Sequence, residues 1–186
     1  MRTITLHVTM PPVTASDHAR GPEDARITLV QYGDFECPFG LQIHQIGQEM
    51  REAFPDDIRL VFRHFPLRYH ANALHAAIAA EAVARASGED AFWTYHDRLF
   101  ANQLAQRPTQ LVEHAEALDA SGAMADAVLA AMEEEAGKTE ILAQKRGAVK
   151  AGLRSTLALF IDGELFQDDD LEDAIIERVI QPLKAG

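Results

Sequence analysis

The chain is poor in cysteine, and its net charge is strongly negative. Cys37 is the single cysteine among 186 residues, so no disulfide can form within the chain and a disulfide framework is excluded. No apolar run approaches the length that a membrane-spanning helix needs. Acidic residues outnumber basic ones by 29 to 17, giving a net charge of −12. Such a surface repels phosphate, so neither nucleic acid nor an anionic membrane is expected as a partner.

Composition and length predict an ordinary globular protein. Apolar residues make up 47% of the chain and charged residues 25%, which excludes a disordered or fibrous architecture. The length predicts one domain, or one domain with an insertion. Residues 1–10 alternate between apolar and polar side chains, which predicts a strand rather than a signal peptide. With a single thiol, the expected location is the cytoplasm, where thiols stay reduced.

The residue patterns in the N-terminal and C-terminal parts of the chain predict strands combined with helices. Strands are expected at 26–33 and 58–64, and a helix at 38–54 would connect them. Asp162-Gly163 is a hairpin signal between strands at 158–161 and 164–166, and a final helix is expected at 169–183. Residues 11–24, rich in proline and polar groups, are expected to form a loop.

The middle of the chain predicts helices only. Their expected spans are 71–87, 90–102, 110–119, 122–135 and 138–152. The order of elements predicts an α/β fold, with a mixed sheet flanked by helices and interrupted by a helical insertion. The sheet domain would comprise 1–66 and 138–186, and the insertion 67–137.

Four segments, in this order, carry a family resemblance. They are ITLVQYGDFECPFG (27–40), VFRHFPLRYH (61–70), AFWTYHDRLFANQ (91–103) and GLRSTLALFIDG (152–163). Together they resemble the DsbA-like branch of the thioredoxin superfamily over about residues 18–183. The resemblance implies a thioredoxin-like fold with an inserted all-helical cap domain. It also implies a redox site at the N-terminus of the first core helix.

The sequence departs from the family pattern at two positions of that site. The family motif is Cys-Pro-x-Cys, and here it reads Cys37-Pro38-Phe39-Gly40, so glycine occupies the resolving position. The family's cis-proline follows a threonine, and here Thr156 is followed by Leu157. A dithiol cycle within one chain is therefore excluded. A cis bond before leucine would cost about 2.5–4 kcal/mol, so a trans bond is expected.

Cys37 remains the candidate catalytic residue. The N–H groups and the dipole of a helix start favour a thiolate, whereas Asp34 and Glu36 oppose one. We expect the helix start to prevail, with its N–H groups bonded to the sulfur and the acids turned towards water. Pro38, Phe39, Thr156 and Leu157 would contact the substrate, with Leu157 and Phe39 filling space over the thiol. The alternative is an inert, half-buried cysteine.

Several functions are compatible with this sequence. The first is a single-cysteine thiol-disulfide oxidoreductase that forms mixed disulfides with glutathione or a thiol-containing partner protein. The second is a non-catalytic thioredoxin-fold binding module that has lost redox activity. The third, also known on DsbA-like folds, is a glutathione-dependent transferase or isomerase. No cofactor is expected beyond glutathione as a co-substrate. No metal site is expected from His64, His70 and His75, and the sequence carries no signal for an oligomeric state.

Overall fold

The structure is a computed structural model that describes residues 10–167 and 171–185. The strand predicted at 1–10 lies, apart from Met10, outside the described residues. The strands are β1 (His18–Arg20), β2 (Ile27–Gly33), β3 (Ile58–His64), β4 (Ala158–Ile161) and β5 (Glu164–Gln167). The helices are α1 (Pro38–Ala53), α2 (Ala73–Ser87), α3 (Glu89–Ala101), α4 (Pro108–Glu116), α5 (Ala123–Glu133), α6 (Lys138–Lys150), α7 (Leu171–Ile175) and α8 (Gln181–Ala185), with a π-helical segment, Ile176–Ile180, between the last two.

The strands form one mixed sheet in the order β1-β3-β2-β4-β5. β2 and β3 are parallel, and α1 is the crossover helix that a parallel pair requires. The other neighbouring pairs are antiparallel. Leu29 of β2 lies opposite Leu60 on one side and Ile161 on the other. The predicted mixed sheet flanked by helices is therefore confirmed.

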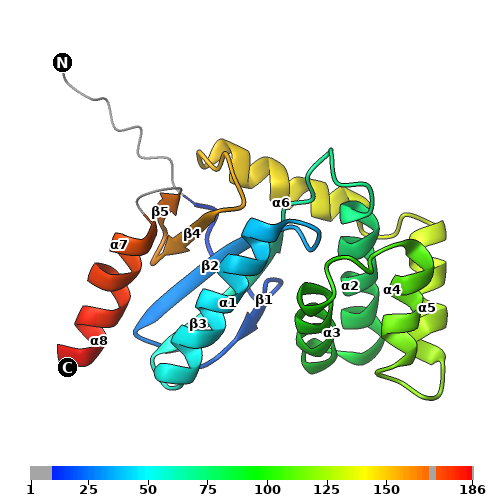
Figure 1. Ribbon diagram of the computed structural model, residues 1–186, viewed down its shortest axis with the longest axis horizontal. Helices are drawn as coiled ribbons and strands as arrows, with labels where there is room; N and C mark the ends of the chain where they lie inside the picture. Colours follow the sequence, from blue (N-terminus) through cyan, green and yellow to red (C-terminus); the bar gives the residue numbers. More distant parts are fainter. Residues whose placement is uncertain (1–9, 168–170, 186) are drawn as a thin grey trace.

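Helices cover both faces of the sheet. Successive side chains of β2 point to opposite faces, so the strand contributes to two separate hydrophobic clusters. Ile27 and Leu29 pack in the cluster that contains α1 and the C-terminal helices, whereas Val30 and Tyr32 pack in the cluster that contains the end of α6. β2 is buried on both faces, as expected for a central strand. In Figure 1, α1 crosses in front of the sheet, and α7 and α8 flank the β5 edge.

The helices α2 to α5 form a second group beside the sheet, at the right of Figure 1. Their core contains the buried alanines of α2 and the aromatic residues of α3, and it reaches the sheet through Phe35 and Phe62. The small side chains of α2 allow close packing against α5. The predicted helical insertion is thus present, while its exact bounds, 67–137, stay a prediction. No helix in the described part of the chain combines the length and apolar character needed to cross a membrane.

Two sequence predictions need correction. The loop predicted at 11–24 contains β1, whose residues His18, Ala19 and Arg20 pair with β3. Three residues with two polar side chains show no strand pattern of their own, so the partner strand determines this element. The helix predicted at 169–183 begins, within the described residues, at Leu171 and widens into a π segment at Ile176–Ile180.

Candidate functional site

Cys37 is the N-cap residue of α1. Its backbone is extended (φ −84°, ψ 124°), and Pro38 occupies the first helical position, where a missing N–H leaves no bond unmade. The cysteine is only 3% exposed. Its Sγ lies 2.9 Å from the hydroxyl Oγ1 of Thr156, which directly precedes the Leu157–β4 segment. The sulfur makes no capping hydrogen bond to the N–H groups of α1, so our expectation that these groups bond to it is wrong.

The two acids of the motif are fixed by a neighbouring loop. Asp34 is buried; its carboxylate accepts hydrogen bonds from the backbone N–H of Leu67 at 2.7 Å and lies 2.9 Å from Nδ1 of His70. Glu36 accepts from the backbone N–H and the side-chain amide of Asn72, at 2.7 and 2.8 Å. The expectation that these acids turn towards water is therefore wrong: they attach the loop between β3 and α2 to the cysteine motif.

The helical insertion also contacts the backbone of the motif. The side-chain amide of Gln103 donates to the carbonyl oxygens of both Phe35 and Cys37, each at 2.8 Å. Gln106 donates to the same Phe35 carbonyl at 2.8 Å. The sequence reasoning missed both glutamines. The one available signal was that Gln103 ends the third of the family-like segments.

The side chains of Thr156 and Leu157 lie in different surroundings. The described residues contain no cis peptide bond, so the bond before Leu157 is trans. Thr156 supplies the contact to the sulfur, whereas Leu157 packs against the core shared by α1 and the C-terminal helices. It lines a groove there together with Ile46 and Met50. Phe39 is 52% exposed and leaves an apolar ring at the surface. The substrate-binding roles of Pro38, Phe39, Thr156 and Leu157 stay predictions.

Gly40, at the degenerate resolving position, lies where α1 comes closest to the preceding loop. A Cβ atom at this position would lie 2.8 Å from the backbone carbonyl oxygen of Asp34. The Gly40 carbonyl in turn accepts a hydrogen bond from the buried amide of Gln31 at 2.8 Å. The close approach therefore involves backbone on both sides, and any side chain at position 40 requires a backbone shift.

Alanine substitutions of the two buried glycines of α1 should have opposite effects. Gly40→Ala should lower the free energy of unfolding by about 1–3 kcal/mol through overpacking. Gly47→Ala should raise it by up to about 1 kcal/mol, because alanine favours helix and the added Cβ meets only Leu60 side-chain atoms at 3.4 and 3.5 Å. Urea unfolding of both variants measures the difference. Equal effects would show that the contact with Asp34 relaxes freely.

Two buried histidines, His44 of α1 and His96 of α3, lie beside the same carboxylate. Nε2 of His44 is 3.8 Å from Asp97, and Nδ1 of His96 is 2.9 Å from the same carboxylate oxygen, Oδ1. The Asp97 Oδ2 atom accepts from Arg20 at 2.8 Å. Burial lowers the pKa of His44 to about 4 and that of His96 to about 3, so both rings are neutral at pH 7. These histidines therefore contribute packing and hydrogen bonding rather than charge.

The depressed histidine pKa values predict loss of stability in acid. Since the folded-state pKa of His44 lies below its unfolded value, the unfolded chain takes up the proton first and is favoured as the pH falls below about 6.5. Between pH 7 and pH 5, the wild-type chain should lose about 2 kcal/mol more than His44→Gln does. Guanidinium unfolding at the two pH values measures this difference. Parallel losses would contradict a neutral, buried His44.

These features define a DsbA-like thioredoxin fold whose motif keeps only the first cysteine. The chain belongs to the thioredoxin family, because residues 14–181 match the model of that family. Among solved structures, it is similar to oxidised BdbD from Bacillus subtilis, with a TM-score of 0.79, 21% identity and coverage of 96% of this chain and 98% of the other. It is also similar to DsbA2 from Pseudomonas aeruginosa, with a TM-score of 0.67, 25% identity and coverage of 88% and 95%.

The curated relatives are much longer proteins. The chain is 37% identical over 148 residues to Na(+)/H(+) antiporter NhaA 1 of Salinispora arenicola, covering 79% of this chain and 22% of the relative. It is 34% identical to Na(+)/H(+) antiporter NhaA of Herminiimonas arsenicoxydans, covering 82% and 24%. The chain thus spans less than a quarter of the length of these relatives.

Proposed function

We propose that this chain performs thiol-disulfide exchange through Cys37 alone, forming a mixed disulfide with glutathione or with a thiol-containing partner protein. The observation that supports this function is the pairing of Cys37 Sγ with the Thr156 hydroxyl at 2.9 Å, at the start of α1. A hydroxyl in that position can donate a hydrogen bond to a thiolate and so favour the reactive form of the sulfur. We also propose that the protein acts in the cytoplasm, where thiols stay reduced.

The proposed exchange is a single displacement. The Cys37 thiolate attacks one sulfur of glutathione disulfide, a new S–S bond forms as the old one breaks, and one glutathione leaves as a thiolate that takes a proton from water. Because position 40 is glycine and the chain has no second cysteine, a second glutathione or a partner thiol must resolve the mixed disulfide. That step returns Cys37 to the thiol and releases a disulfide.

A second candidate function, a non-catalytic binding module, is favoured by the 3% exposure of Cys37. Exposed apolar side chains near the motif also favour this function. Phe39 is exposed, and Tyr69 and Leu104 are exposed along a groove of about 660 Å³ that Glu36 also lines. Such a surface suits an extended peptide or a protein partner. The antiporter relatives, which match this chain over a small share of their length, are consistent with a module that serves a larger protein.

Glutathione disulfide separates the two functions. The folded protein, incubated with it, should acquire one glutathione adduct by intact mass, and Cys37→Ala should acquire none. Iodoacetamide should modify native Cys37 as well. If either reagent reaches Cys37 only in denaturant, the thiol is inaccessible and the binding module is the correct function.

The absence of a resolving cysteine gives a further expectation. The protein should show no catalysis of insulin reduction in a dithiothreitol-coupled assay, because a mixed disulfide formed by Cys37 has no neighbouring thiol to release it. A dithiol thioredoxin serves as the positive control. Turnover comparable to that control would contradict the single-thiol mechanism.

A further inference from the structure

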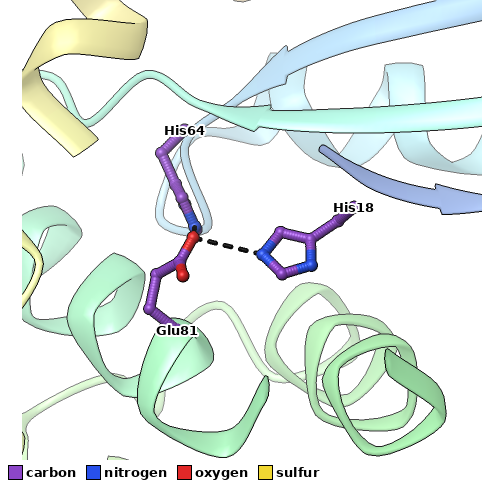
Figure 2. A group of neighbouring side chains, drawn as sticks. All are labelled: His18, His64 and Glu81. Carbon is purple, nitrogen blue, oxygen red and sulfur yellow. Dashed lines mark hydrogen bonds and ion pairs between the residues drawn. The ribbon is translucent and has the colours of Figure 1, made fainter. Parts of the chain in front are cut away.

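Three side chains from distant parts of the chain converge beside the insertion, as Figure 2 shows. His18 begins β1, His64 ends β3, and Glu81 lies in the middle of α2. The Nε2 atoms of His18 and His64 each lie 3.1 Å from Oε1 of Glu81. All three ligand-type atoms lie within 4.8 Å of one another. His64 is 1% exposed, and its Nδ1 atom has no partner among the described residues, so Nε2 is its polar contact and points into the cluster.

We propose that His18, His64 and Glu81 bind a divalent transition metal ion of the zinc class. Imidazole nitrogen and carboxylate oxygen are ordinary zinc ligands, and donors at about 2.0–2.1 Å from a tetrahedral ion stand about 3.3 Å from one another. The two 3.1 Å separations match that spacing. Three protein ligands leave a fourth coordination position for water.

The surroundings of His18 support metal ligation. Its other ring nitrogen, Nδ1, lies 2.9 Å from Oε2 of Glu89. Histidine ligands commonly donate the second N–H to a carboxylate, which fixes the ring and raises its basicity. Without a metal, both ring nitrogens of His18 face a carboxylate oxygen, and each contact is a hydrogen bond only when that nitrogen carries a proton. A metal at Nε2 leaves His18 neutral with a single N–H, and that N–H already has its acceptor.

Charge distinguishes this cluster from the one formed by His44, His96 and Asp97. Glu81 and Glu89 together supply two negative charges against a divalent ion. Arg85 approaches Glu81 at 3.8 Å, but on the other carboxylate oxygen, Oε2, and its side chain is 49% exposed. By contrast, Arg20, whose side chain is 14% exposed, donates to Oδ2 of Asp97 at 2.8 Å, so the carboxylate beside His44 and His96 already has a close, largely buried counter-charge. We therefore assign the metal to the His18, His64 and Glu81 cluster only.

The proposed ion would connect the helical insertion to the sheet, because α2 belongs to the first and β1 and β3 to the second. The unfolded chain does not hold these ligands together, so binding should stabilise the folded state. No ligand spacing in the sequence indicates this site, because His18 and His64 lie 63 and 17 positions from Glu81 along the chain.

The test uses the full chain after removal of metals with a chelator and dialysis. Zn²⁺ should bind with one equivalent in titration calorimetry and raise the melting temperature, and Co²⁺ should give the absorption of a four-coordinate site. Glu81→Gln and His64→Gln should abolish all three signals. His75→Gln, on the same helix as Glu81 but outside the cluster, should bind like the wild type, and so should Cys37→Ala.

Glu89→Gln provides a second test if a variant that lacks a ligand fails to fold. It should leave the ligands in place and weaken Zn²⁺ binding by about 10- to 100-fold. No saturable Zn²⁺ binding to the wild type would overturn the proposal. Unchanged binding by folded Glu81→Gln or by Glu89→Gln, or loss of binding in Cys37→Ala, would also overturn it.

Discussion

Asp17→Ala should lower the free energy of unfolding by about 3–5 kcal/mol, because it leaves the buried guanidinium of Arg63 without its counter-charge. The two side chains are 7% and 5% exposed. Arg63 donates from Nε and Nη2 to the two carboxylate oxygens of Asp17, at 2.6 and 2.8 Å. Burial alone would lower the pKa of Arg63, but the hydrogen bonds to Asp17 and Tyr32 outweigh it and raise the pKa. The pair is therefore fully ionised in the folded chain.

Arg63 makes this pair a structural junction. It also donates to the backbone carbonyl groups of Pro11 and Pro12 and to the hydroxyl of Tyr32. If Arg63 moved after the loss of Asp17, the segment before β1 would lose these hydrogen bonds. Guanidinium unfolding measures the change. Arg178→Ala, which breaks the exposed pair with Glu164, is the control and should cost less than about 1 kcal/mol. A similarly small loss for Asp17→Ala would contradict the junction.

Thr156→Val should slow the reaction of Cys37 with glutathione disulfide by about 10-fold or more. Valine keeps the shape of threonine but removes the hydroxyl that lies 2.9 Å from the sulfur. A hydrogen bond to a charged group contributes about 1.5–3 kcal/mol, and about 1.4 kcal/mol corresponds to a factor of ten. Stopped-flow or quenched mass measurements of adduct formation give the rate.

Thr156→Ser is the matched control, because it keeps the hydroxyl and removes the methyl group. Its rate should stay close to that of the wild-type chain, so a fall confined to valine identifies the hydrogen bond. Equal rates for valine and threonine would mean that the hydroxyl does not support the thiolate. Thr156 would then contribute only to the packing around Cys37.

The sequence predicted the parts of the site that depend on neighbouring residues. Pro38 indicated the start of α1, and Asp162-Gly163 indicated the hairpin; both residues of that turn have positive φ, 49° and 87°. Order and spacing of the family-like segments located Cys37 and Thr156, which the fold brings to 2.9 Å from each other. Such inferences succeed because they follow local backbone geometry or a whole-chain pattern.

The parts that failed depend on partners far along the chain. We expected Asp34 and Glu36 to turn towards water, but the β3–α2 loop supplies their hydrogen-bond donors. The convergence of His18 and His64 on Glu81 likewise exists only once β1 has paired with β3 and α2 has packed beside them. Neither arrangement leaves a periodicity or a spacing in the sequence.

The close approach at Gly40 has an evolutionary consequence. A single mutation to cysteine there would place its Cβ 2.8 Å from the Asp34 carbonyl oxygen, a contact with backbone that requires the backbone to shift. Such a variant would bear the cost of overpacking, about 1–3 kcal/mol, whether or not it gained a dithiol, and a compensating change in the Asp34 loop would reduce that cost. A cysteine at position 40 is therefore costly for this chain to acquire by that one mutation alone.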